Sequence, residues 1–222
     1  FRMPNLSSTS SYNAYVMMAN GTSSPTSSLG DHGMNNLVKN CHGSAANGRG
    51  PRSGFAQYNS STVETQFNNR FEDNEIQDWY YAGIYTYYVH NAQLKGNIIH
   101  NTNNYRSGSK YGIYTYNYGS RGGSRKVGYG HQITYNKIYD VHGGGSTTSQ
   151  QYGIYLNGYY GTGSVDLNVR FNEIDLTCHG TGYGIYNYGY YNYHSAETNL
   201  SDNRINIDYK NSITYSMYAI YN

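Results

Sequence analysis

Short runs of alternating apolar and polar residues recur along the chain, separated by segments rich in Asn, Gly and Ser. In Ile154-Tyr155-Leu156 the apolar residues fall two positions apart, which places alternate side chains on one face of a β-strand. Gly, Asn, Ser, Thr and Tyr are abundant, whereas the strong helix formers Leu, Ala, Glu and Lys are scarce. The pattern therefore predicts an all-β chain.

A Gly-Ile-Tyr phrase recurs within these runs. Its four copies and two degenerate members are Gly83-Ile84-Tyr85, Gly112-Ile113-Tyr114, Gly153-Ile154-Tyr155, Gly184-Ile185-Tyr186, Gly54-Phe55-Ala56 and Ala219-Ile220-Tyr221. Neighbouring side chains on a strand face opposite sides, so we expect the Ile of each copy to point inward and the following Tyr to point outward.

A second phrase, Asn-x-Ile or Asn-x-Val, lies between successive copies of the first. Its six pairs are Asn36/Val38, Asn74/Ile76, Asn97/Ile99, Asn136/Ile138, Asn172/Ile174 and Asn203/Ile205. Asn tolerates the left-handed backbone conformation, and its amide can bond to the amide of a neighbouring repeat. We therefore expect each Asn to form a tight bend, and the stacked bends to form a structural Asn ladder. An apolar residue stands three positions before the Asn in five copies, and Gly33 is the exception.

The spacing of the second phrase, 23 to 39 residues, is typical of fixed strands joined by turns of variable length. The two phrases resemble the repeats of the pectin-lyase-like superfamily, which read Gly-Ile-x-x and then apolar-x-x-Asn-x-Ile. The resemblance covers residues 31 to 222 and implies a right-handed parallel β-helix, or β-solenoid, of about six rungs. Residues 1 to 30 contain one candidate strand near Ala14 to Met18, and we interpret them as an irregular first coil or cap.

Charged residues fit the same register. At the position after the Asn, successive repeats carry Lys137, Glu173 and Arg204, and two positions before it a neighbouring pair is Glu72 and Lys95. Adjacent rungs of a β-helix lie about 4.8 Å apart, so the alignment brings opposite charges together.

The tyrosines that follow the inward Ile are expected to stack along the helix axis on the outer face. With their neighbours they form a candidate binding stripe of Tyr85, Tyr114, Tyr116, Tyr155, Tyr186, Tyr188 and Tyr221. One interpretation is that the stripe only stiffens the sheet. The other is an interaction face for a protein or for the apolar faces of sugar rings, since Tyr supplies a large contact area with few rotatable bonds.

Composition and charge narrow the range of partners. The 222 residues include 30 Tyr and 27 Gly, only 13% are charged, and the formal net charge is +2. No strong field attracts nucleic acid or an anionic membrane, and no apolar run reaches the roughly 20 residues of a membrane helix. We predict no nucleic-acid partner and no membrane insertion. The composition and the resemblance together favour an extracellular or cell-surface location.

The superfamily includes lyases, hydrolases, adhesins and phage fibres, so the resemblance leaves the function open. Its enzymes hold a polysaccharide along one sheet, with clustered acids that bind calcium or with a pair of acids. In the rung register Glu75, Asp166 and Glu173 are isolated from one another, and Lys137 and Arg204 account for Glu173. We therefore predict no catalytic residue, no metal site and no cofactor. A polysaccharide-binding or polysaccharide-cleaving β-helix is the alternative.

Two further features carry weaker signals. Three histidines precede Gly at similar distances after their Asn, namely His42, His142 and His179. A repeated turn residue is the main interpretation, and metal binding or acid–base chemistry is the alternative. We interpret the basic segment 120–130 as a solvated loop, and binding of an acidic glycan is the alternative.

The register also bears on assembly. Cys41 and Cys178 lie four rungs apart, about 19 Å, which exceeds the roughly 7 Å limit for a disulfide within one chain. The chain ends in the strand phrase Ile220-Tyr221, so we expect head-to-tail stacking of copies into a fibre, or a place in a longer solenoid. The sequence thus favours a non-catalytic, extracellular structural or adhesive β-solenoid.

Overall fold

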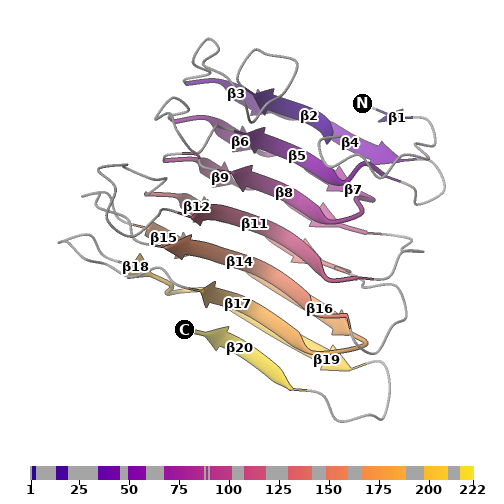
Figure 1. Cartoon of the computed structure of the whole chain (residues 1–222), viewed down its shortest axis with the longest axis vertical. Coiled ribbons are helices and arrows are strands. Elements are labelled where there is room, and N and C mark those ends of the chain that lie inside the picture. Colours follow the sequence, from indigo (N-terminus) through magenta and orange to yellow (C-terminus); the bar gives the residue numbers. More distant parts are fainter. Residues whose placement is uncertain are drawn as a thin grey trace.

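The computed structural model in Figure 1 forms a stack of parallel strands. It describes residues 2–3, 14–19, 35–45, 50–58, 68–87, 89, 91–101, 108–118, 130–141, 149–159, 167–188, 198–209 and 216–222. These residues form twenty β-strands and no helix. The all-β prediction is confirmed.

The strands belong to three parallel sheets. Sheet 1 contains β1 (Arg2–Met3), β4 (His42–Ala45), β7 (Glu75–Gln77), β10 (Ile98–His100), β13 (Lys137–Tyr139), β16 (Glu173–Cys178) and β19 (Arg204–Tyr209). Sheet 2 contains β2 (Ala14–Ala19), β5 (Ser53–Tyr58), β8 (Ala82–Tyr87), β11 (Lys110–Tyr118), β14 (Gln151–Tyr159), β17 (Gly182–Tyr188) and β20 (Met217–Tyr221). Sheet 3 contains β3 (Leu37–Lys39), β6 (Arg70–Glu72), β9 (Gln93–Lys95), β12 (Gln132–Thr134), β15 (Leu167–Arg170) and β18 (Thr198–Asn199).

Each rung takes one strand from sheet 3, then one from sheet 1, then one from sheet 2. Six such rungs run from β3 to β20, and β1 and β2 precede them in the described residues. The strands of sheet 2 run along the front of Figure 1, those of sheet 1 return behind them, and the path descends with a right-handed turn. The predicted parallel β-helix of about six rungs is confirmed.

Part of the segment expected to be an irregular first coil or cap is regular. β1 pairs with β4, and β2 pairs with β5, so both strands extend sheets of the solenoid. The rest of residues 1 to 30 lies outside the described residues, and the boundary at residue 31 stays a prediction.

The interior is one continuous apolar core between the three sheets. In the middle rungs each sheet contributes at least one inward residue, for example Ile133, Ile138 and Ile154 in the fourth rung. All three side chains are fully buried. In sheet 2 the inward column runs from Phe55 through the Ile of each Gly-Ile-Tyr phrase, in the expected register.

Asparagine side chains stack at the corner between sheets 3 and 1. The Asn97 amide oxygen accepts hydrogen bonds from the backbone N and Nδ2 of Asn74, at 3.2 and 2.9 Å. Its Nδ2 donates to the Phe71 carbonyl at 2.8 Å and to Asn136 Oδ1 at 2.9 Å. Asn136 and Asn172 bond to the following Asn in the same way. Buried amides therefore find partners on neighbouring rungs, as buried polar groups require.

Asn36 is not a member of this stack, contrary to the prediction. Leu37 pairs with Arg70, which places Asn36 beside Asn69 at the preceding corner, where its backbone N donates to Asn69 Oδ1 at 2.9 Å. The ladder position of this rung is taken by Cys41, whose backbone N donates to Asn74 Oδ1 at 3.0 Å. An Asn with an apolar residue two positions later occurs at both corners, as at Asn36/Val38 and Asn74/Ile76. One copy of this phrase therefore does not fix the strand register.

The bend itself is also made by a different residue than we expected. The left-handed residues precede the ladder position and are Asn40, Asp73, Gly96, Tyr135, Phe171 and Asp202, with φ between 52° and 68°. The backbone turns at this residue, and the next residue then directs its side chain inward. The ladder position therefore favours Asn because its side-chain amide both donates and accepts hydrogen bonds, and not because Asn tolerates the left-handed conformation.

The other register predictions agree with the structure. Lys137 pairs with Glu173, Glu173 pairs with Arg204, and Glu72 pairs with Lys95. Arg204 Nη1 lies 3.5 Å from Glu173 Oε1, an exposed ion pair that contributes under about 1 kcal/mol. Cys41 and Cys178 are both free thiols.

Candidate functional site: the tyrosine surface of sheet 2

The outer face of sheet 2 carries three columns of tyrosines, which we call the tyrosine surface. The first column contains Tyr111, Tyr152, Tyr183 and Tyr218; the second contains Tyr85, Tyr114, Tyr155, Tyr186 and Tyr221; the third contains Tyr58, Tyr87, Tyr116 and Tyr188. Strand pairing fixes the register of the first two columns throughout, while Asn157 interrupts the third between Tyr116 and Tyr188.

A local backbone feature places two tyrosines of each Tyr-Gly-Ile-Tyr phrase on the same face. A Cβ added to Gly153 would lie 2.6 Å from the carbonyl oxygen of Gly184 and 2.5 Å from Ile174 Cγ2. Position 153 therefore faces the interior and admits only glycine, and Ile154 after it is also buried. With two inward positions in succession, Tyr152 and Tyr155 both lie outside, with ring centroids 4.9 Å apart.

The rings stack along the axis of the solenoid. In the first column, successive centroids from Tyr111 to Tyr152 and Tyr183 are 4.9 and 4.8 Å apart, with interplanar angles of 8° and 6°. In the second column, Tyr186 lies parallel to Tyr155 at 5.0 Å and to Tyr221 at 4.9 Å. These spacings match the rung repeat of about 4.8 Å and lie in the range in which aromatic pairs attract.

The exposure of the tyrosines differs from one end of the surface to the other. Tyr85 and Tyr114 are each only 7% exposed, because they pack with Ala56, Tyr58 and Ala82 in a second apolar cluster outside the sheet. The expectation that the whole stripe is an accessible face is therefore wrong for these two residues. The half-buried or exposed members of the predicted stripe are Tyr116, Tyr155, Tyr186, Tyr188 and Tyr221.

Burial also determines the ionisation of the phenols. Desolvation, reinforced by the neighbouring Tyr114 and Tyr155, raises the pKa of Tyr111 to about 12. Burial likewise raises the pKa values of Tyr85, Tyr114 and Tyr152 above the usual value. These buried phenols are therefore uncharged at neutral pH, and their hydroxyl groups remain hydrogen-bond donors.

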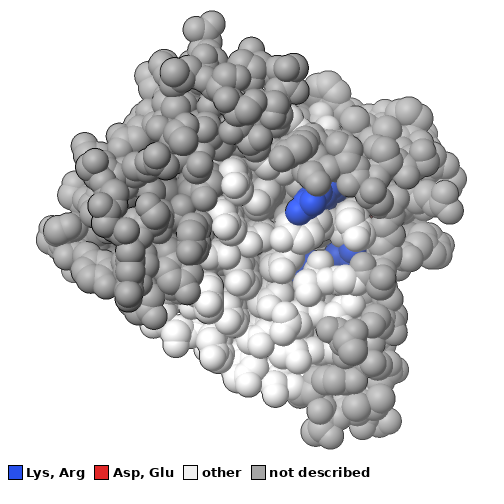
Figure 2. Space-filling view, viewed as in Figure 1, with Lys and Arg blue, Asp and Glu red and all other residues white. Residues whose placement is uncertain are grey.

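The surroundings of the columns are nearly free of charge. Figure 2 shows the described atoms of sheet 2 as a continuous uncharged band, with Lys or Arg atoms near one edge and no Asp or Glu visible among them. Near these strands the Arg52 guanidinium lies 4.4 Å from the Tyr81 ring centroid, and Lys110 Nζ lies 4.3 Å from that of Tyr80. Sugar rings or an uncharged protein surface suit such a band better than a strongly charged ligand.

The first column was not part of the predicted stripe. Its signal is present in the sequence, because Tyr111, Tyr152 and Tyr183 each stand directly before a Gly-Ile pair. Strict alternation assigns a residue three positions from an outward Tyr to the opposite face. Because the glycine and the Ile after it both face inward, the Tyr before the glycine lies on the outer face instead.

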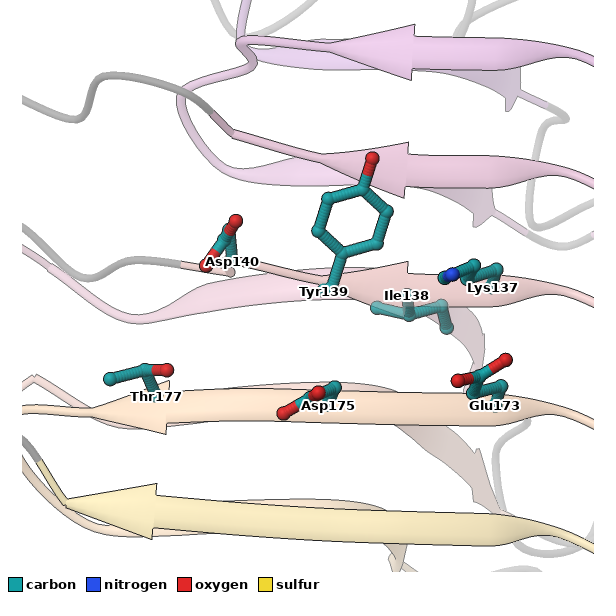
Figure 3. Close-up of a pocket in the computed structure, with 7 residues that line it drawn as sticks. All are labelled: Lys137, Ile138, Tyr139, Asp140, Glu173, Asp175 and Thr177. Carbon is teal, nitrogen blue, oxygen red and sulfur yellow. The ribbon is translucent and has the colours of Figure 1, made fainter.

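A second candidate site lies on the outer face of sheet 1, where β13 and β16 border a groove of ≈ 260 Å³. It is lined by Lys137, Ile138, Tyr139, Asp140, Glu173, Asp175 and Thr177. In Figure 3, Lys137 and Glu173 lie at one end of the groove, and Asp140 and Thr177 lie at the other.

Glu75 and Glu173 are three rungs apart in sheet 1, as expected, but the groove brings Glu173 near two other acids that we had not considered from the sequence. Asp175 follows it by two residues on the same face of β16, and Asp140 lines the same groove. Asn206 Nδ2 donates to Asp175 Oδ1 at 3.2 Å, and Arg204 pairs with Glu173, so both carboxylates have a partner on β19. Asp166 lies outside the described residues.

His42 and His179 do not occupy equivalent positions in their rungs. His42 begins β4 and pairs with Glu75, whereas His179 follows the end of β16. His142 and the basic residues Arg121, Arg125 and Lys126 lie outside the described residues. Among the residues that are described, no three His, Cys, Asp or Glu side chains are placed to hold a metal ion.

Comparison with known proteins adds no assignment. No protein-family model, curated protein or solved structure matches the chain. Within the described ranges, no helix has the length and apolar character needed to cross a membrane. The functional assignment therefore rests on the geometry of the two outer faces.

Proposed function

We propose that the chain is a non-catalytic structural or adhesive β-solenoid, located outside the cell or on its surface, which binds through the tyrosine surface. The observation that carries this proposal is the ordered, uncharged set of rings from Tyr155 to Tyr186, Tyr188 and Tyr221. Tyr188 and Tyr221 are each 43% exposed while their rings stay ordered by stacking against Tyr186. Pre-ordered aromatic side chains lose little entropy when they bind.

The fold supports membership of the pectin-lyase-like superfamily. The right-handed parallel β-helix, the short corner between sheets 3 and 1, and the stacked Asn74, Asn97, Asn136, Asn172 and Asn203 are the features that the sequence resemblance implies. The superfamily contains adhesins and fibres as well as enzymes, and fold alone does not choose among them.

We also propose that the stack of rungs continues beyond the sixth, through a second copy bound head to tail or through further rungs of a longer solenoid. In the fifth rung Ile174 and Leu176 are buried, whereas their neighbours Ile205 and Ile207 in the sixth are only partly buried. Ile220 is 47% exposed, although Ile185 beside it is fully buried. Another rung would cover these side chains and pair the edges of β19 and β20.

The binding proposal is tested by a double variant, Tyr186→Ala with Tyr188→Ala. We expect it to lose affinity for a polysaccharide among pectin, alginate and cellulose, measured by co-sedimentation. Tyr135→Ala is the matched control, because Tyr135 is also an exposed ring but lies at the corner between sheets 3 and 1. Equal losses in both variants would contradict a role for the tyrosine surface.

Electron microscopy tests the assembly proposal. Head-to-tail fibres should show an axial repeat of about 34 Å, because sheets 1 and 2 each contain seven strands spaced by about 4.8 Å. Dispersed single particles at high protein concentration would rule out stacking of copies and leave the longer solenoid.

A second function is favoured by the groove on sheet 1. Glu173 and Asp175 place two carboxylates on one face of β16, with Lys137 and Tyr139 across the groove on β13. A pair of acids beside a sugar-sized groove is the basic requirement of a glycoside hydrolase. Release of reducing ends from a polysaccharide, abolished by Glu173→Gln and by Asp175→Asn, would replace the non-catalytic assignment.

A further inference from the structure

Two phenol rings at one end of the tyrosine surface are both closely stacked and accessible. The rings of Tyr186 and Tyr221 are 4.9 Å apart and parallel within 1°. Tyr221 is exposed and Tyr186 is half-buried. The Tyr85 and Tyr114 pair is almost as close, at 5.2 Å, but both rings are buried. Proximity and access to a reagent therefore coincide at Tyr186 and Tyr221.

The same rings belong to a continuous aromatic path along the second column. From Tyr114 to Tyr155, Tyr186 and Tyr221, successive centroids are 4.9, 5.0 and 4.9 Å apart. Oxidation of a phenol removes one electron and one proton, and burial disfavours the loss of that proton. An electron vacancy created within the column therefore settles on the rings that reach water.

We propose that Tyr186 and Tyr221 form an oxidative cross-linking site, at which a haem peroxidase with hydrogen peroxide joins the fifth and sixth rungs through dityrosine. Each phenol gives up one electron and one proton to become a tyrosyl radical. The two radicals then form a carbon–carbon bond between the ring positions ortho to the hydroxyl groups. The two ortho hydrogens move to the oxygens and restore the phenols, while hydrogen peroxide takes up two electrons and two protons and becomes two waters.

The cross-link would fix an otherwise exposed rung. β20 pairs with β17 along one edge, and Met217 and Ile220 on it are exposed. A covalent bond from Tyr221 to Tyr186 ties this strand to the rung before it, as a disulfide limits the unfolded states of the loop that it closes. The proposal rests on ring geometry and on the exposure of Tyr221 in the free chain, and it does not require the tyrosine surface to bind a partner.

Mass spectrometry of the full chain, oxidised at low concentration with horseradish peroxidase and hydrogen peroxide, tests the site. Trypsin cuts after Arg170, Arg204 and Lys210, so Tyr186 falls in peptide 171–204 and Tyr221 falls in peptide 211–222. We expect these two peptides to be joined. An equal mixture of light and heavy-isotope chains should give only light–light and heavy–heavy products, because the link lies within one chain.

Two matched variants of the same rung locate the bond. Tyr221→Phe keeps the ring but removes the phenol, and we expect at least a tenfold loss of the joined peptide. Tyr218 lies in the first column beside the buried Tyr183, with the two ring centroids 5.1 Å apart. Tyr218→Phe should leave the joined peptide unchanged. Absence of the joined peptide in the unmodified chain, its persistence in Tyr221→Phe, or mainly mixed-isotope products would each overturn the proposal.

Discussion

Replacing Asn136 by Ala removes the middle of the Asn ladder. Its Nδ2 donates to the Leu94 carbonyl at 2.8 Å and to Asn172 Oδ1 at 3.0 Å, and its Oδ1 accepts from the backbone N and Nδ2 of Asn97. The side chain is buried, so the change leaves four polar atoms of three neighbouring residues without this partner. At about 1 kcal/mol for each bond, we expect a loss of about 3–5 kcal/mol in the free energy of unfolding.

Urea unfolding followed by circular dichroism measures this loss, provided that the slope with denaturant is unchanged. Asn206→Ala is the matched control, because Asn206 is exposed on sheet 1 and its amide bonds to Asp175 and Asp208 at the surface. We expect the control to cost under about 1 kcal/mol. If the two variants are equally stable, the buried amides do not hold the rungs together and the reasoning is refuted.

The location of the effect provides a second measurement. A solenoid is stabilised mainly by contacts between neighbouring repeats, so the loss should be concentrated in the rungs next to Asn136. Hydrogen exchange should accelerate first in β9, β12 and β15, which flank the substituted corner in sheet 3. Uniform acceleration from β3 to β18 would mean that the described rungs open as one unit.

Three further predictions concern single sites. Cys41→Asn should stabilise the chain by about 1 kcal/mol in the same urea assay, because an amide at this ladder position adds a donor toward Asn74 Oδ1. Thr115→Val should raise the melting temperature, since the buried Thr115 Oγ1 has no hydrogen-bond partner in the described structure and a methyl group has nearly the same shape. Because folding raises the pKa of Tyr111 from 10.0 to about 12, its contribution to stability is complete below pH 10 and lost as the pH rises through about 12. An alkaline titration that follows phenolate absorbance should therefore show delayed ionisation and unfolding in that window, and a transition finished near pH 10 would contradict it.

The sequence predicted those features that depend on strand alternation. The register of Ile113, Ile154 and Ile185 in sheet 2 and the pairing of Lys137 with Glu173 follow directly from period-two alternation and a fixed rung. The corner was harder, because Asn36 and Asn74 occupy chemically similar bends on different corners. The sequence nevertheless contained evidence for the correct register of this rung. Val38 stands three positions before Cys41, where the repeat requires an apolar residue before the ladder position.

Tertiary packing explains what alternation could not supply. Tyr85 points to the outer face as predicted, but rings on three sides cover it, and burial of this kind depends on neighbours far apart in sequence. Tyr135 and Phe171 adopt left-handed conformations that bulky residues disfavour. Their rings stack at 5.0 Å and the Arg170 guanidinium lies 4.7 Å from the Phe171 ring centroid, contacts that help to offset the backbone cost.

The lengths of the connections indicate which face of the solenoid is adapted to function. Between sheets 3 and 1, five successive corners have only two residues, as in 73–74 and 96–97. The connections from sheet 1 to sheet 2 vary from three residues, at 179–181, to eleven, at 140–150. The Asn ladder accounts for the constant corner, because an inserted residue would break its hydrogen bonds with both neighbouring rungs. Connections of variable length lie at both ends of the sheet 2 strands, but at only one end of the sheet 1 strands, where Asp140 of the connection 140–150 also lines the groove. Segments of variable length around a rigid face are the usual arrangement of a binding site, which favours sheet 2 over the groove of sheet 1 as the functional face.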